Sequence, residues 1–238
     1  MTTFRGDLAP PHLWFTRLRY LSQTVVKPSP LLLEQRPPGW QGGDIAVFST
    51  GALLDTRDRE LWTRRGVATE ASLFANPSLG SLSQFGTHGA DVTARGYASL
   101  WAGGSLAVRG LAEIRRGDVP SFKWIRTEGI YGGEGLGGAN SIRGVARDRI
   151  SGPDKLNSTV ELRQLALPLN LLARNFDLGF AGGFDTGWAH QPGYAPVSAA
   201  GAFVGFRMLV DRASHIRVDV GYAGLAPPAI YFLADDTF

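Results

Sequence analysis

Apolar and polar side chains alternate with a period of two along most of this chain. Between Asp91 and Trp101, for example, Val92 and Leu100 share one face, whereas Asp91 and Arg95 share the other. Alternation of this kind is typical of β-strands that have one apolar and one polar face. The pattern predicts about ten strands, near residues 12–22, 44–55, 66–75, 90–101, 104–115, 157–167, 174–188, 200–211, 214–224 and 228–238.

The connections between the predicted strands are of two kinds. No amphipathic helical stripe separates the strands, which argues against a βαβ architecture. Residues 211–214 predict a tight hairpin turn, whereas residues 116–156 form a long irregular connection. A loop of that length within a compact domain is usually functional or disordered. We therefore expect a single all-β domain over residues 1–238, with one long loop.

Two all-β architectures fit this pattern. A soluble sandwich or lipocalin-like barrel would bury the apolar faces, whereas a transmembrane barrel would turn them toward lipid. Opposite charges recur on the polar faces of neighbouring predicted strands, which suits a packed polar lumen. Short connections also alternate with long ones, as in outer-membrane barrels. These features favour an antiparallel transmembrane β-barrel; the charged residues concerned are Arg95, Arg109, Glu113, Glu161, Arg163, Asp185, Arg207, Arg217 and Asp219.

The composition is compatible with this prediction and excludes several functions. Glycine accounts for 31 of 238 residues and aromatic residues for 11%, which suits short strands with frequent turns. A hydrophobic content of 44% argues against intrinsic disorder, and no apolar run is long enough for a membrane-spanning helix. The net charge of +3 comes from arginines spread along the chain beside acidic residues, so we expect no nucleic-acid partner. The chain has no cysteine, and its start lacks the features of a signal peptide.

Enzyme and cofactor motifs are absent or lack their structural context. Residues 133–138 spell G-x-G-x-x-G, but no helix-forming segment follows them. The four histidines have no metal-ligand spacing, and no G-x-S-x-G sequence occurs. Asp55 and Asp58 stand beside Arg57 and Arg59, which is typical of a salt-bridged turn. We therefore expect no enzymatic activity, no cofactor and no metal site.

Four short motifs occur in order along the chain. They are Asp55-Thr56-Arg57-Asp58, the sequence GGANSIRG over 137–144, Val160-Glu161-Leu162-Arg163, and Phe184-Asp185-Thr186-Gly187. Together they resemble the barrel of the bacterial surface antigen family of outer-membrane protein assembly factors, the BamA/TamA family. The chain departs from the family at Val145, where an aromatic residue is expected. Family barrels have sixteen strands, so the resemblance implies either the C-terminal part of such a barrel or a smaller barrel; we favour an open or partner-completed sheet.

The resemblance implies a specific arrangement of the long loop. Residues 116–156 would fold back into the barrel lumen, and Arg143 would pair with Glu161 and Asp185 on the inner wall. A guanidinium in a narrow lumen needs carboxylates within reach, and both acids fall on predicted polar faces. The alternative is that Arg143 is an exposed loop residue. The resemblance also assigns a loop motif (Gly137, Gly138, Ser141, Ile142 and Gly144) and a C-terminal strand signal (Phe232 and Phe238).

By the same resemblance, the expected function is the insertion or translocation of outer-membrane proteins in the bacterial outer membrane. The expected partners are outer-membrane lipid and unfolded client proteins, or barrel strands and periplasmic domains that this chain lacks. The second hypothesis is a non-transporting anchor or surface antigen barrel. The third is a soluble lipocalin-like binder.

Overall fold

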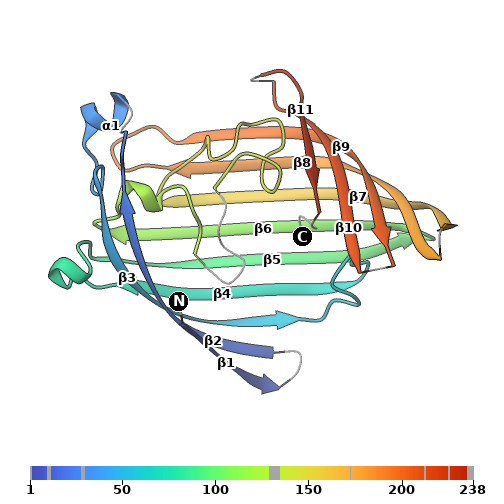
Figure 1. Ribbon diagram of the computed structural model, residues 1–238, viewed down its shortest axis with the longest axis horizontal. Helices are drawn as coiled ribbons and strands as arrows, with labels where there is room; N and C mark the ends of the chain where they lie inside the picture. Colours follow the sequence, from blue (N-terminus) through green and yellow to red (C-terminus); the bar gives the residue numbers. More distant parts are fainter. Residues whose placement is uncertain are drawn as a thin grey trace.

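The chain forms one antiparallel sheet (Figure 1). The computed structural model describes residues 2–9, 12–27, 30–128, 135–171, 173–211, 213–224 and 226–234. Over these residues the sheet has eleven strands, and each strand pairs with its neighbours in the sequence. The all-β prediction is therefore confirmed. The strands are β1 (Thr2–Ala9), β2 (His12–Thr24), β3 (Gly42–Asp55), β4 (Gly66–Asn76), β5 (Thr87–Trp101), β6 (Gly104–Gly117), β7 (Asp154–Leu171), β8 (Arg174–His190), β9 (Val197–Val210), β10 (Ser214–Tyr222) and β11 (Ala229–Leu233).

Each of the predicted strands is present, and β1 is an additional one. β1 pairs with β2 from Thr2 opposite Leu18 to Ala9 opposite His12. The sequence signal for β1 is weak, because Phe4 is one of few large apolar residues in that segment. The predicted hairpin between β9 and β10 is also present, closed by a 3.0 Å hydrogen bond from the Ala213 N–H to the Val210 carbonyl.

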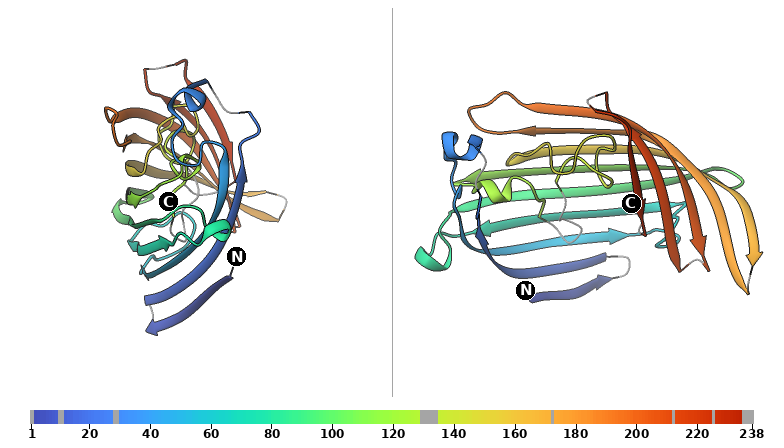
Figure 2. Two further views of the ribbon diagram at one scale, coloured as in Figure 1. Left: turned by 90° about the vertical axis from the view of Figure 1, so that its left-hand side faces the viewer. Right: turned by 45° about the horizontal axis from the view of Figure 1, so that its top comes forward.

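The sheet curves into a trough, and the segment between β6 and β7 lies on its concave side (Figures 1 and 2). β10 and β11 run steeply across the direction of the central strands (Figure 1). Within the described ranges, β1 pairs only with β2 and β11 only with β10. The sheet is therefore open at both edges over these residues, in line with the expectation of an open or partner-completed sheet.

Polar side chains are buried on the concave face, and apolar side chains are exposed on the outer face. On β8, Asp185 is 0% exposed whereas its neighbour Phe184 is 68% exposed. On β9, Arg207 is 1% exposed and Val204 is 65% exposed. The alternation predicted from the sequence is confirmed, and it places charge inside. The buried charged residues of the strands include Arg17, Glu70, Asp91, Arg109, Glu113, Arg115, Lys155, Glu161, Arg163, Asp185, Arg207, Arg217 and Asp219.

The connections differ in length at the two ends of the sheet. At one end most turns are short, as in residues 102–103 between β5 and β6, although residues 56–65 form a longer connection between β3 and β4 there. At the opposite end they are long, and they carry the short helices α1 (Pro30–Gln35), η1 (Gly80–Leu82) and η2 (Ser121–Lys123). In the part of the chain that the structure describes, none of the helices is both long and apolar enough to cross a membrane.

Candidate functional site

The segment between β6 and β7, residues 118–153, packs on the concave face of the sheet (Figure 1). Four apolar side chains in its described part are almost fully buried, and their burial is favourable by roughly 1.5–3 kcal/mol each. This packing fixes the segment against β8. The cluster consists of Leu136, Ile142, Val145 and Ile150 with Ala189 of β8.

The tip of this segment is a tight turn formed by the predicted loop motif. Gly137, Gly138 and Gly144 have φ values of +109°, +96° and +90°, a region that favours glycine. The Ser141 Oγ accepts a hydrogen bond of 2.8 Å from the Gly137 N–H. Ile142 belongs to the buried apolar cluster. The turn therefore fixes the position of the residue that follows Ile142.

That residue, Arg143, is completely buried. Its Nε and Nη2 donate to Asp185 Oδ2 and Oδ1 at 2.8 and 2.9 Å, so two parallel hydrogen bonds join the side chains. Its Nη1 lies 3.2 Å from Asp219 Oδ2 and 3.4 Å from Glu161 Oε2. The guanidinium also stacks on the ring of Phe203, with Cζ 3.0 Å from the ring centroid. We call Arg143, Glu161, Asp185 and Asp219 the latch cluster.

The predicted contacts of Arg143 with Glu161 and Asp185 are confirmed, and the alternative of an exposed loop arginine is wrong. Asp219 is a contact that the sequence did not predict. Its position on a polar strand face was evident, but the distance between β7 and β10 depends on the curvature of the sheet. Such curvature cannot be read from residue spacing alone.

Further arginines surround the latch cluster and share its carboxylates. Arg163 Nε lies 2.8 Å from Glu161 Oε1. Arg207 pairs with Asp219 and also lies 3.5 Å from Glu161. Arg217 Nη1 lies 3.2 Å from Asp219 Oδ2. Because burial removes the hydration of every one of these charges, loss of a single partner leaves others uncompensated.

Glycines on three neighbouring strands allow the tip to approach the sheet closely. A Cβ at Gly221 of β10 would lie 2.5 Å from Arg143 Cβ and 2.8 Å from the Gly144 nitrogen. A Cβ at Gly201 of β9 would collide with the Arg143 carbonyl, and one at Gly187 of β8 with the Ile142 side chain. The tip therefore packs directly against the backbone of β8, β9 and β10.

The start of the 118–153 segment is held by a second group of ion pairs. The Glu128 carboxylate contacts both Arg19 and Lys123. The Glu128 N–H donates to Glu113 Oε2 at 2.6 Å, and Lys155 Nζ lies 2.7 Å from Glu113 Oε1. Burial lowers the pKa of Lys123 well below its usual range, and the neighbouring cations Arg115 and Arg19 lower it further. The segment is thus fixed at its start as well as at its tip.

A connection from the opposite end of the sheet also reaches the concave face. Trp62, between β3 and β4, is fully buried and has φ +54°. Its ring meets His215 of β10 edge-on, with centroids 5.9 Å apart. Arg163 Cζ lies 5.5 Å from the Trp62 ring. Since Arg163 also binds Glu161, contacts run from Trp62 to the latch cluster.

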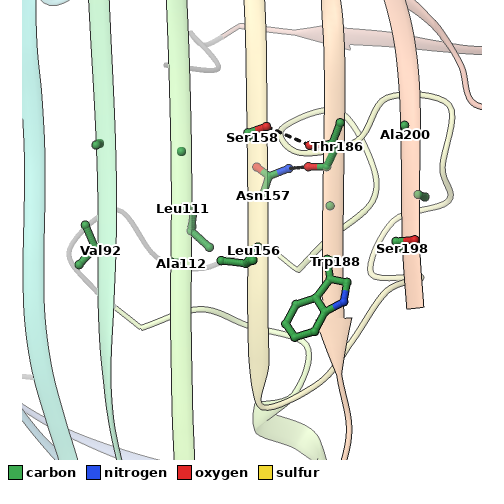
Figure 3. A pocket seen from close by; sticks show the side chains of 14 residues that line it. Val92, Leu111, Ala112, Leu156, Asn157, Ser158, Thr186, Trp188, Ser198 and Ala200 are labelled. Carbon is green, nitrogen blue, oxygen red and sulfur yellow. Dashed lines mark hydrogen bonds between the residues drawn. The ribbon is translucent and has the colours of Figure 1, made fainter. Parts of the chain in front are cut away.

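The outer face carries a shallow depression over β5–β9 (Figure 3). The hydroxyls of Ser158 and Thr186 bond to each other there at 2.9 Å. The outward hydroxyls of Thr16 and Thr50 are also within hydrogen-bond distance, at 3.3 Å. These hydroxyls find partners within the protein, on a face that is mostly apolar. The depression is lined mainly by small residues, including Ala94, Gly110, Ala112, Ser198 and Ala200.

Three other sequence predictions concern the Asp55–Arg57 turn, the aromatic residues of the C-terminal strand and metal binding. The Asp55–Arg57 turn is salt-bridged as expected, with Nη2 2.7 Å from Oδ2. Phe232 of β11 is 76% exposed on the outer face, whereas Phe238 lies outside the described residues. No group of three or more histidine, aspartate or glutamate side chains suited to a metal occurs in the described part of the chain.

The comparisons with known proteins identify no family. No protein-family model matches the chain, and a search of curated proteins finds no relative. The BamA/TamA resemblance therefore rests on the four sequence motifs alone.

We expect Arg143→Ala to lower the free energy of unfolding by about 3–5 kcal/mol, because it leaves buried carboxylates without their partner. Arg143→Lys should restore only part of this loss, since an ammonium cannot form two parallel bonds. Denaturant titration measures both effects. Arg147→Ala is the matched control, because that side chain is 69% exposed on the same segment. Equal stability of the Arg143→Ala and Arg147→Ala proteins would contradict the role of the buried pairs.

Gly221→Ala should displace the tip while leaving the strand ladder intact. The added methyl would overlap Arg143, and overpacking of this kind costs about 1–3 kcal/mol. Gly110→Ala on β6 is the control, because a Cβ there meets no atom within 4 Å. Hydrogen exchange of residues 135–150 should accelerate in the Gly221→Ala protein alone. Unchanged exchange would show that the tip does not sit on β10.

Proposed function

We propose that the chain forms the wall of an outer-membrane β-barrel of the BamA/TamA type and takes part in the insertion or translocation of outer-membrane proteins. The observation that carries the proposal is the burial of Arg143 by carboxylates on the concave face. A loop arginine, docked in this way on the inner wall of a barrel, is the arrangement that the motif resemblance implies.

The distribution of side chains supports a membrane location. On β6, the outward residues from Leu106 to Ile114 are uncharged, and the first outward charge is Arg116 at the end of the strand. A transmembrane strand needs about 9–11 residues. The outward hydroxyls of Ser158 and Thr186 are paired, as they must be where no water is available. Exposed apolar side chains over the whole outer face would aggregate in water but suit lipid.

The open edges of the sheet support a non-covalent mechanism. β1 and β11 each lack a second neighbour within the described residues. An unpaired edge presents backbone N–H and C=O groups to which an extended segment can add as a further strand. In our proposal a client strand, or a strand of the remaining barrel wall, pairs there. The 118–153 segment keeps the adjacent concave face closed.

A non-transporting anchor or surface antigen barrel is the second candidate. The observation in its favour is the filling of the concave face, by the 118–153 segment from one end and Trp62 from the other. The soluble lipocalin-like binder is less well supported. Such a protein needs an apolar interior, whereas the buried residues of this concave face include many charges.

An insertion assay separates these candidates. The protein is reconstituted in phospholipid vesicles, and a urea-denatured outer-membrane barrel protein is added by dilution. Our proposal predicts faster folding of this client than in empty vesicles, and slower folding with the Arg143→Ala protein than with the Arg147→Ala protein. Equal client folding with and without the reconstituted chain would favour the anchor. A monodisperse protein in buffer without detergent would contradict both.

Val204→Arg tests the orientation of the outer face. Val204 lies near the middle of β9 and is 65% exposed. If this face contacts lipid, an arginine near the bilayer midplane costs about 2–4 kcal/mol. Ala195→Arg, in the exposed β8–β9 connection, should have almost no effect. The measurement is the free energy of unfolding of both variants in lipid vesicles. An equally small cost for both would show that the outer face is not in lipid.

A further inference from the structure

β11 is attached to the sheet by a short ladder. It spans Ala229–Leu233 and pairs with residues 217–221 of β10. By comparison, β10 pairs with β9 over its whole length, from Ser214 to Tyr222. In the described residues, β11 has no other strand beside it. The backbone pairing alone therefore holds this edge strand weakly.

A side chain of β11 provides a further attachment. The Tyr231 hydroxyl accepts a hydrogen bond of 2.9 Å from the Gly144 N–H, at the tip of the 118–153 segment. Tyr231 stands opposite Asp219 in the β10–β11 ladder. Asp219 in turn lies 3.2 Å from Arg143 Nη1. Two consecutive residues of the tip therefore bind two residues that face each other on β10 and β11.

Tyr231 also lines a pocket that remains between the tip and β11, so open space adjoins its side chain there. At Gly144 the tip lies directly against the backbone at the end of β10, because a Cβ there would be only 2.6 Å from the Ala223 nitrogen. The pocket is lined mainly by small and apolar residues, including Gly138, Ala139, Val145, Ala146, Ala229 and Leu233, together with Asn140 and Arg147.

We propose that the Gly144–Tyr231 hydrogen bond couples the docking of the 118–153 segment to the pairing of β11. When Arg143 is bound to its carboxylates, Gly144 holds Tyr231 and β11 stays on β10. When the tip leaves the sheet, β11 loses this attachment and its backbone becomes available to an incoming strand. The use of that edge by a client rests on the proposed function, whereas the coupling itself is a property of the fold. Tyr231 is thus a positioning residue that holds β11 at the edge of the sheet.

Hydrogen exchange with the Tyr231→Phe protein tests the attachment. Loss of one neutral hydrogen bond should increase the exchange of residues 229–233 and their β10 partners about three- to tenfold. Tyr20→Phe is the matched control, because the Tyr20 hydroxyl donates to Asp44 at 2.7 Å near the opposite edge of the sheet. Exchange in β11 should be unchanged in that protein. Equal exchange in the Tyr231→Phe and wild-type proteins would overturn the proposal.

A second comparison tests the coupling. Arg143→Lys should also accelerate exchange in β11, and Tyr231→Phe should add little to it, because the tip is already loosened. Independent, multiplicative effects of the two substitutions would show that Tyr231 acts without the latch cluster, and the coupling would be wrong. Exchange needs no client protein. If the effects of Arg143→Lys and Tyr231→Phe on exchange are coupled but the insertion assay fails, the proposed function is rejected and this inference stands.

Discussion

The positive charge of Arg143 inside the concave face is the constraint on which the rest of the structure depends. A guanidinium taken out of water loses several kcal/mol of hydration, which only close carboxylates with good geometry can offset. Asp185, Glu161 and Asp219 provide them from β8, β7 and β10. These strands can meet at one point only if the sheet is strongly curved. Gly187, Gly201 and Gly221 then let the loop backbone approach the sheet closely enough for the Arg143 side chain to reach these carboxylates.

Burying charge on one face leaves the apolar residues on the other. The concave face is held together by ion pairs and by buried apolar side chains of the strands, such as Ile45, Val47 and Phe74, and of the connections. The outward apolar side chains are exposed instead, and the free energy of that arrangement depends on the solvent around them. Lipid is the medium that accommodates such a face, and this is the physical reason for favouring a membrane wall over a soluble binder.

Much of this arrangement could be predicted from the sequence. A period of two is a local property, so the strands from β2 to β11 and their polar faces followed from it, and the motif resemblance added the pairing of Arg143. Three features could not be predicted. β1 has weak alternation, and Asp219 reaches Arg143 only through sheet curvature. Trp62 lies in the β3–β4 connection, where the Asp55–Asp58 motif gives no sign that the ring reaches His215. The last two depend on contacts between segments far apart in the chain.

A double-mutant cycle between Arg143 and Asp185 tests the central claim most directly. The free energy of unfolding is measured for the wild-type protein, Arg143→Ala, Asp185→Ala and the double variant. If the two side chains are bound to each other in the buried geometry described, their coupling should be about 2–3 kcal/mol, in the upper part of the range for contacting residues. Additivity within about 0.5 kcal/mol would mean that they act independently, and the docked position of the loop would then be wrong.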